Sequence, residues 1–471
     1  MLKNIFRVAI SNFTSIISGI LTGFLIPKML SVQDYGYYKT FTLYVSYLGI
    51  CSLGIIDGIV LQYGSQNYDQ LDEKKFRSYF KWYMIVHVVV AAAIIGSSFL
   101  FKDVNYSIIC VLLGANLIAV NVSGYFQQIS QITQRFKEYS FRKILQSLGS
   151  VVLVAFLFAF SVSGNNVSYV IYSVGIVIIN FLLVFWYIHT YRKIVFGDSY
   201  SLNETRNDIL GLIKIGFPLL FANLCSTLIL SLDRQFVNVL FSNKDYAVYA
   251  FAYSMLSLIT VATSAISTVL YPMLKRMNEE EFKRNYDIFL VCVTMFVYLM
   301  VAVYYPLSMF INWYLPKYHD SIEIFRIIIP GIAISSSITV LMHNYYKTLQ
   351  KNIIYFKKSI VILVLSGIIN YIAYRLFGTM QAISMASVVT IIVWYLYVDN
   401  GLSNDCESKK GKNIFYIIMM LGSFYLSSSI PNMIVGFIIY VVLYFVITFM
   451  YYKNYILQLR KMLSKRTDNV F

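Results

Sequence analysis

Two opposite charges stand side by side in an otherwise apolar stretch: Asp233 and Arg234, within residues 216–241. If this stretch is a helix inside a membrane, each charge costs about 2.5–3.5 kcal/mol on insertion scales, and such residues mark function by default. Neighbours on a helix point about 100° apart, so each charge needs a partner on another helix, water or a ligand. The guanidinium of Arg234 offers a planar fork of donors that suits phosphate. We take both residues as candidates for binding a phosphate-bearing substrate, with a structural pair to another helix as the alternative.

Two more charged residues lie in the first two apolar stretches of the chain, 8–30 and 40–63. Lys28 ends the stretch 8–30 and is a further candidate cation for the substrate, although a lysine that reaches to the membrane surface explains it equally well. Asp57 stands between Gly54 and Gly58, and glycines permit close helix approach. Its carboxylate either makes a fixed structural contact or belongs to a gate.

The stretch 322–346 holds three further candidates for gating or coupling. Glu323 and Arg326 are three residues apart and can pair along a helix. His343 has a side chain that titrates near neutral pH, which suits coupling to H+, while a buried and simply hydrogen-bonded histidine is the alternative. We expect no cofactor, and coupling to H+ or Na+ stays open.

Residues typical of metal sites and enzymes are scattered along the chain. The five cysteines and four histidines show no C-x-x-C or H-x-x-H spacing, so we expect no metal site. The sequence has no Walker A stretch, no G-x-S-x-G and no G-x-G-x-x-G in a suitable context. Connections predicted to lie outside, such as 163–166 and 242–245, are too short to hold catalytic groups. We therefore expect a protein that is not an enzyme.

The composition requires a membrane around these residues. Of the 471 residues, 58% are hydrophobic and 13% are charged, which is too apolar for a water-soluble core with a polar surface. Runs of about 20 apolar residues can cross the hydrocarbon as helices, and the period-2 alternation of a membrane barrel is missing. We predict an all-α polytopic membrane protein with about 14 transmembrane helices. The predicted spans are residues 8–30, 40–63, 82–101, 106–133, 144–163, 167–189, 216–241, 246–273, 288–313, 322–346, 359–377, 380–398, 414–430 and 433–452.

The basic residues give the chain an orientation. The net charge is +16, and most of the 38 Lys and Arg residues lie in every second connection and near the two termini. Basic residues that flank spans stay on the cytoplasmic side. We therefore place both termini in the cytoplasm and expect attraction to anionic membrane lipids rather than to nucleic acid. Many tyrosines at predicted span ends suit an aromatic belt at the membrane surface.

Two weak sequence echoes indicate a parallel repeat. The pattern D-Y-x-x-Y begins at Asp34 and again at Asp245, an offset of 211, and a glutamine followed by a basic residue occurs at Gln134 and again at Gln350, an offset of 216. The similar offsets and the matching sidedness predict two six-helix lobes in the same sense, with the last two spans as an addition. The predicted parts are an N-terminal lobe at 1–190, a cytoplasmic linker at 191–215, a C-terminal lobe at 216–398, and an additional helix pair with a basic tail at 399–471.

Four runs stand in order along the chain: Phe24–Tyr38, Leu53–Gly58, Leu232–Val237 and Ser321–Pro330, the last followed by 344–347. Together with the length and the repeat, they resemble the Wzx-type polysaccharide flippases of the MOP superfamily. The resemblance implies a MATE-like, V-shaped pair of lobes around a cationic cavity, with alternating access. It also implies a substrate: an undecaprenyl-diphosphate-linked oligosaccharide repeat unit, moved from the cytoplasmic to the outer leaflet of the bacterial inner membrane for O-antigen or capsule synthesis.

Other function classes stay open. An ion-coupled drug antiporter of the same superfamily is less favoured because the first span lacks a mid-membrane Asp, and a lipid II flippase because that span offers only Lys28 where such flippases tend to carry Arg. A membrane-embedded glycan polymerase or ligase is disfavoured by the short outer connections. Besides the lipid-linked substrate and membrane lipids, the resemblance implies a polysaccharide polymerase and a chain-length regulator as partners.

Overall fold

The computed structural model describes residues 2–64, 66–275, 277–403, 405–406 and 410–467, and these ranges hold helices and no strands. The chain divides into two compact units, Met1–Ala250 and Phe251–Phe471, called here the first and the second unit. Within each unit, the end that carries the basic connections is called the basic end, and the other is called the opposite end.

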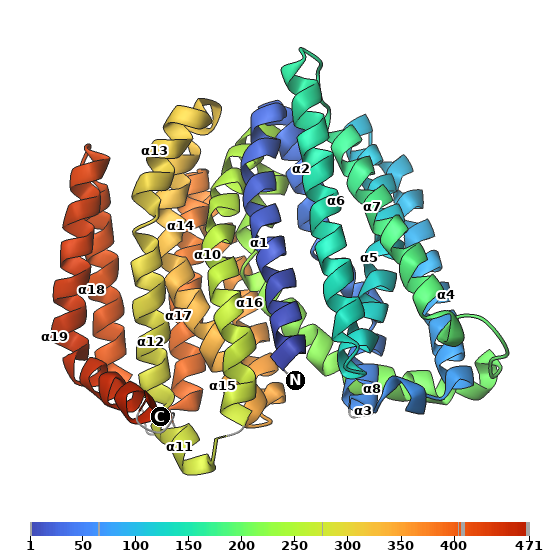
Figure 1. The fold of residues 1–471 in the computed structure, drawn as a ribbon. Coiled ribbons are helices and arrows are strands. Elements are labelled where there is room, and N and C mark those ends of the chain that lie inside the picture. Colours follow the sequence, from blue (N-terminus) through green and yellow to red (C-terminus); the bar gives the residue numbers. More distant parts are fainter. Residues whose placement is uncertain (1, 65, 276, 404, 407–409, 468–471) are drawn as a thin grey trace. The chain divides into compact units, whose positions relative to one another are not determined.

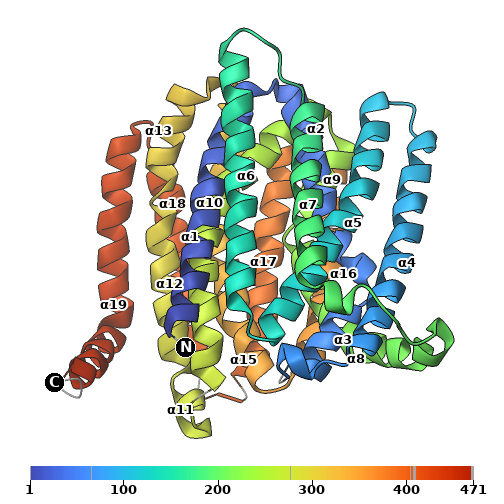
Figure 2. The same cartoon turned by 45° about the vertical axis from the view of Figure 1, so that its right-hand side comes forward.

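The first unit consists of α-helices joined by short turns and four short 3-10 helices (Figures 1 and 2). Its elements are α1 (Leu2–Met29), α2 (Val32–Val45), η1 (Leu48–Ser52), α3 (Ile55–Tyr63), η2 (Tyr68–Gln70), α4 (Glu73–Ser97), η3 (Ser98–Leu100), α5 (Val104–Ile132), α6 (Phe136–Val162), α7 (Tyr169–Thr190), η4 (Arg192–Ile194), α8 (Leu202–Ile229), α9 (Leu232–Leu240) and the start of α10 (Asn243–Lys275).

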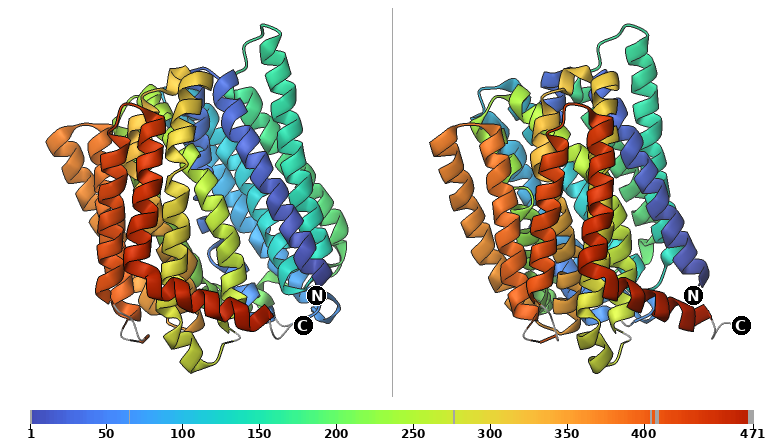
Figure 3. Two further views of the ribbon diagram at one scale, coloured as in Figure 1. Left: turned by 60° about the vertical axis from the view of Figure 1, so that its left-hand side comes forward. Right: turned by 90° about the vertical axis from the view of Figure 1, so that its left-hand side faces the viewer.

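The second unit contains most of α10 and the remaining helices. These are α11 (Glu279–Arg284), α12 (Tyr286–Val301), α13 (Tyr304–Tyr314), η5 (Pro316–Tyr318), α14 (Ser321–Ser336), the π-helical turn η6 (Ser337–Met342), α15 (His343–Thr348), α16 (Asn352–Phe377), α17 (Met380–Leu402), α18 (Lys410–Ser428) and α19 (Met433–Thr467). Helices α18 and α19 pack side by side (Figure 3).

The helices are long and apolar enough for a membrane. Within the described residues, 11 helices pass this criterion, and a twelfth span is added if the bent pair Val32–Ser52 and Ile55–Tyr63 counts as one. Side chains such as Val89, Phe156 and Phe185 are more than 60% exposed, which suits contact with lipid and not with water. The chain is therefore a multi-pass membrane protein, whereas the predicted number of 14 spans is not confirmed. Asn413–Ser428, inside one predicted span, is shorter than a full crossing.

The sequence repeat corresponds to repeated local structure at the opposite end. Ser31 caps α2: its hydroxyl donates to Asp34 (2.7 Å) and accepts from the Asp34 N–H (3.0 Å). Ser242 makes the same two bonds with Asp245, at 2.6 and 3.2 Å, before α10. A serine cap with an acid three residues later satisfies the free N–H groups of a helix start.

The second echo is also a repeated structure, at the basic end of each unit. Gln134 and Gln350 both have φ +57°, and the N–H of the next residue donates to the carbonyl five positions earlier, at 2.8 and 2.9 Å. One left-handed residue lets the chain end one helix and begin the next after only three residues. Both sequence echoes therefore correspond to repeated local structure, and the division into two six-helix lobes stays a prediction.

A third pair of equivalent positions holds a cation. Arg142 lies over the ring of Trp186 and donates to its carbonyl (3.5 Å), near the end of α7. Lys358, at an offset of 216, lies over the ring of Tyr397 and donates to its carbonyl (2.7 Å), near the end of α17. Trp186 and Tyr397 are themselves 211 positions apart. Because a helix C-terminus attracts cations, these two basic residues are part of the scaffold.

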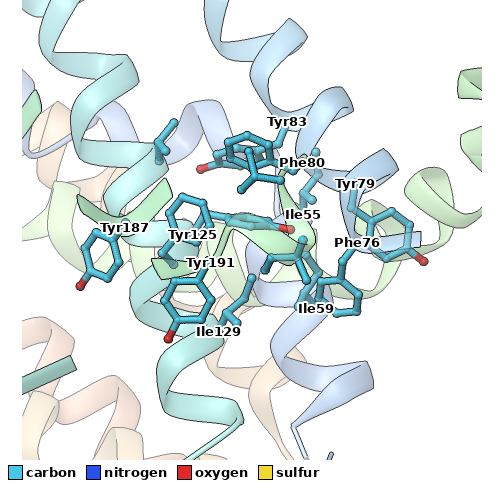
Figure 4. Close-up of a cluster of buried hydrophobic side chains, with 14 of the residues drawn as sticks. Ile55, Ile59, Phe76, Tyr79, Phe80, Tyr83, Tyr125, Ile129, Tyr187 and Tyr191 are labelled. Atoms are coloured by element: carbon cyan, nitrogen blue, oxygen red, sulfur yellow. The ribbon is translucent and has the colours of Figure 1, made fainter. Parts of the chain in front are cut away.

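Tyrosines form much of the core rather than only a surface belt. At the basic end of the first unit, buried rings from α3, α4, α5 and α7 pack together with isoleucines (Figure 4). Tyr79, Tyr125 and Tyr187 are each about 1% exposed there. Rings at 5–6 Å centroid distance, such as Phe80 and Tyr125 at 5.6 Å, gain offset or edge contacts in addition to apolar burial.

The stretch 191–215, predicted as a linker, is largely helical. Ser201 and Glu204 form a capping box that starts α8, which then continues into the predicted span 216–241 and ends at Ile229. The chain before α8 is fixed along α4, because Arg77 donates to the carbonyls of Lys193 (2.6 Å) and Asp198 (2.9 Å). The start of α8 runs crosswise to α4 at the basic end in Figures 1 and 2. The residues of the capping box are present in the sequence, but the basic and acidic residues around them led to the prediction of a linker.

Glycines set the distance between α3 and α8. Leu53 (φ +51°) and Gly54 (φ +83°) turn the chain between η1 and α3, and this pair of segments is bent by 56°. A Cβ atom at Gly58 would clash with the backbone of Leu212, and one at Gly216 would clash with the backbone of Gly54. The two helices can approach this closely only because glycine has no side chain.

We therefore expect Gly216→Ala to destabilise the protein by about 1–3 kcal/mol, because the backbone of α3 must move away. The measurement is the apparent melting temperature of the full chain in detergent. Gly211→Ala is the matched control on the same helix, since nothing lies within 4 Å of a Cβ atom there. Equal melting temperatures for the two variants would contradict this account of the contact.

Candidate functional site

The predicted span 216–241 is broken, and the break creates a short polar helix. α8 ends at Ile229 and α9 begins at Leu232. The nine residues of α9 carry Asp233, Arg234, Gln235 and Asn238 among apolar residues. In a membrane, these polar groups must be satisfied by neighbouring helices.

Three hydrogen bonds fasten α9 and its N-cap residue to α2 and the turn that follows α2, and we call them the α2–α9 ladder. The donors and acceptors recur at intervals of four and three residues along both segments, so the members that belong to one helix lie on one face of it. The rungs are Thr40 with Asn238 (2.6 Å), Tyr44 with Gln235 (2.8 Å) and Tyr47 with Ser231 (2.8 Å).

Asp233 ties α9 to the start of α10. Its carboxylate accepts from the Tyr249 hydroxyl (2.7 Å) and from the Arg234 N–H (2.7 Å). It is 1% exposed and stands in the first turn of α9, where a negative charge is favourable. This burial favours a positioning role for Asp233 over direct contact with a substrate.

Arg234 lies beside a second cation. Its Nη2 donates to the carbonyl of Leu230 (3.0 Å) at the end of α8. Lys39 of α2 lies close enough for the two positive charges to repel, and its ammonium sits 5.2 and 5.4 Å from the ring centres of Tyr35 and Tyr38. Both basic side chains are half-buried. Like charges in apolar surroundings raise the energy of the protein, and an anion between them would lower it.

The two cations lie at similar depth. Lys39 is seven residues into α2 and Arg234 is six residues before the end of α9. At 1.5 Å per residue, each backbone position is ~10 Å from the opposite end of the first unit. The pair therefore lies about two helical turns from the opposite end of the unit.

The sequence did not single out Lys39 as a site residue. It stands near the predicted edge of a span, where basic residues are common, and it is distant from Arg234 along the chain. The signal that was present is the matched spacing of polar residues in α2 and α9, since those residues set the register of the two helices and bring Lys39 to Arg234.

Two other predicted residues of the first unit lie elsewhere. Lys28 is in the last turn of α1, and its side chain is exposed. Asp57 is half-buried in the first turn of α3, where its carboxylate bonds to its own backbone N–H. Their roles in binding and gating stay predictions.

Three predicted residues belong to the second unit. The expected ion pair between Glu323 and Arg326 does not form: Glu323 is exposed and accepts from Gln381 (3.3 Å), and the pairing prediction is wrong. The physical reason is that Glu323 faces α17, which offers it a neutral donor. His343 stacks on the ring of Tyr355 at 4.5 Å. No group of three His, Cys, Asp or Glu residues that could hold a metal occurs in the part of the chain that the structure describes.

Comparisons with solved structures identify the fold. The lipid II flippase MurJ in an inward closed conformation has a TM-score of 0.70 at 13% identity, over 95% of this chain and 99% of that one. An inward-facing multidrug resistance MATE family transporter of the MOP superfamily has a TM-score of 0.62 at 14% identity, over 86% and 99%. A mutant of the Vibrio cholerae MATE transporter VcmN has a TM-score of 0.55 at 14% identity, over 85% and 97%. The predicted all-helical, MATE-like fold is confirmed.

The sequence comparisons address the family. A search of curated protein sequences finds no match. A family model described as "Polysaccharide biosynthesis protein" matches residues 1–278, which is more than half of the chain. The resemblance seen in the sequence is thus confirmed, and this chain belongs to the polysaccharide biosynthesis protein family.

Proposed function

We propose that this chain is a flippase for undecaprenyl-diphosphate-linked oligosaccharide repeat units, which it moves from the cytoplasmic to the outer leaflet of the bacterial inner membrane. The observation that carries the proposal is the pair of neighbouring cations, Lys39 and Arg234, within the membrane layer of a polysaccharide biosynthesis family member. The glycan serves a surface polysaccharide such as O-antigen or capsule. Both termini then face the cytoplasm.

The chemistry of the two cations suits a diphosphate. A lipid diphosphate has two adjacent phosphates, and Arg234 and Lys39 supply a planar fork of donors and a compact ammonium. Binding exchanges the repulsion between the cations for two attractions. Asp233 holds α9 and α10 so that the guanidinium keeps its place. The prenyl chain stays in lipid, polar and aromatic residues contact the glycan, and Lys28 remains a candidate for a further contact.

The transport cycle that we propose is alternating access by movement of two lobes. The chain supplies no chemical step, so the protein is not an enzyme in this proposal. Coupling to H+ or Na+ is a further proposal, with Asp57, Glu323, Arg326 and His343 as the residues to test. A polymerase and a chain-length regulator are the proposed protein partners, since they would use the flipped product.

One alternative is an ion-coupled drug antiporter, because the fold is also that of a multidrug MATE transporter. Such substrates are commonly cationic, and paired cations would repel them. A glycan polymerase or ligase is the other alternative. It is disfavoured because short turns such as 30–31 and 241–242 join the spans at the opposite end.

In cells that depend on this chain for surface polysaccharide, Arg234→Ala should abolish surface glycan while the protein stays in the membrane. Lys39→Ala should reduce it strongly, and Arg234→Lys should keep part of it, because one charge remains without the bidentate geometry. The measurement is surface glycan together with the sidedness of lipid-linked sugar. A flippase defect leaves single lipid-linked units on the cytoplasmic face, whereas a polymerase defect displays single units outside. Unchanged glycan in Arg234→Ala would exclude the proposed role.

Removing the repulsion between the cations should stabilise the protein. We expect Lys39→Met to raise the stability by on the order of 1 kcal/mol, because a desolvated like charge is replaced by an apolar chain. The same variant should bind undecaprenyl diphosphate more weakly. Lys102→Met, in an exposed loop position, is the control and should change neither property. A lower melting temperature for Lys39→Met would show that the lysine is a structural residue.

Loss of the hydrogen bond between Tyr249 and Asp233 should lower the stability of the protein more than it lowers ligand binding. Tyr249→Phe leaves a buried carboxylate with one donor fewer and should cost about 1–2 kcal/mol. Binding of undecaprenyl diphosphate should fall less than in Arg234→Ala, because Tyr249 acts on the guanidinium through Asp233 and not by direct contact with the diphosphate. Tyr200→Phe, at a 43% exposed position, is the control for loss of a hydroxyl. A melting temperature that is the same for Tyr249→Phe and Tyr200→Phe would remove the positioning role.

A further inference from the structure

Arg326 is a charged residue in the second unit whose expected partner is engaged elsewhere. It stands in the second turn of α14, within the candidate span Ser321–Thr348, most of which is buried. Its side chain is half-buried, and its Nε is fully buried with no hydrogen-bond partner. Glu323 accepts from Gln381 instead, and the ion pairs of the described residues do not include Arg326.

The groups from neighbouring helices that lie near Arg326 are neutral phenols. Tyr304 of α13 and Tyr425 of α18 are within its electrostatic reach. The hydroxyl of Tyr425 already donates to the carbonyl of Ile327 (3.0 Å). The ring of Tyr304 packs at 5.5 Å on Phe325 of α14. The site thus consists of aromatic and phenolic groups from three helices around one guanidinium.

A guanidinium in these surroundings is costly without an anion. Arginine stays charged at any physiological pH, so it cannot escape the cost by losing its proton. A buried N–H donor without an acceptor costs a further ~1–3 kcal/mol of stability. Each of these terms is relieved by a negative group at the guanidinium.

We infer that Arg326 binds the phosphate of a lipid at the opposite end of the second unit. Its backbone lies five residues, ~8 Å, below the start of α14, which is within reach of the headgroup layer for a long side chain. The flanking helices are accessible to lipid at the same end: Trp313 of α13 is 78% exposed and Leu426 of α18 is 74% exposed. The acyl or prenyl chain lies against these apolar side chains while the phosphate meets the guanidinium.

Two lipids share this chemistry, a phospholipid and a prenyl diphosphate. The inference is independent of the proposed function, since a phospholipid alone would satisfy it. If the prenyl diphosphate is the ligand, Arg326 is a second phosphate station on the way to the outer leaflet.

The test is native mass spectrometry of the purified full chain with phosphatidylglycerol, with undecaprenyl diphosphate and with uncharged diacylglycerol. Arg326→Gln should weaken the binding of one phosphate-bearing lipid by at least about tenfold and leave diacylglycerol unchanged. Arg326→Lys should keep part of the affinity and confirms that the position tolerates substitution. Arg375→Gln, an exposed basic residue at the same end of α16, is the matched control and should bind as the unaltered chain does.

Competition between the two lipids identifies the ligand. Loss of phosphatidylglycerol alone assigns a structural phospholipid, and displacement of phosphatidylglycerol by undecaprenyl diphosphate assigns a substrate station. Unchanged binding in Arg326→Gln, or an equal loss in Arg375→Gln, overturns the inference. The Arg326-dependent binding should persist in Arg234→Ala, so that failure of this inference and failure of the proposed function are separate results.

Discussion

The α2–α9 ladder is the interaction on which the candidate site depends. A membrane offers no water to the polar face of a nine-residue helix, so α9 can exist only against a partner that satisfies it. The rung between Thr40 and Asn238 is buried and 2.6 Å long. With its two companions it fixes both the distance and the register of α2 and α9. Register is the decisive property, because it determines that Lys39 and not an apolar neighbour lies beside Arg234.

The hydrogen bonds that form the site thus act against the repulsion between its two cations. The ladder and the bond from Tyr249 to Asp233 hold together two cations that repel each other. A scaffold that stores such repulsion is stabilised when an anion enters and relaxes when the anion leaves. This is the behaviour required of a carrier, which must release what it binds. A site without the two neighbouring cations would hold the polar helix equally well and would have no affinity for phosphate.

Much of the fold was legible in the sequence. Apolar runs of about 20 residues predicted the spans, and two offsets predicted a repeat that recurs down to single hydrogen bonds at Ser31 and Ser242. The predictions that failed concern the points where a helix ends inside a predicted span and the partners of side chains on different helices. The end of α8 at Ile229 is not marked in the sequence by a glycine or a proline. Glu323 and Arg326 had ideal spacing, but Gln381 of another helix competed for the carboxylate. Contacts between distant helices decide such cases, and local spacing does not record them.

Comparison of equivalent positions in the two units distinguishes basic residues that stabilise the fold from basic residues that the fold does not require. Arg142 and Lys358 occupy equivalent positions and make equivalent contacts at helix ends, so each unit needs a cation there. Lys39 has no such counterpart: the residue 211 positions later is Ala250, which is buried. A fold that forms with alanine at the equivalent position does not require lysine for its stability. The scaffold therefore does not explain this lysine, and its position beside Arg234 supports the proposed role of the two cations in binding an anion.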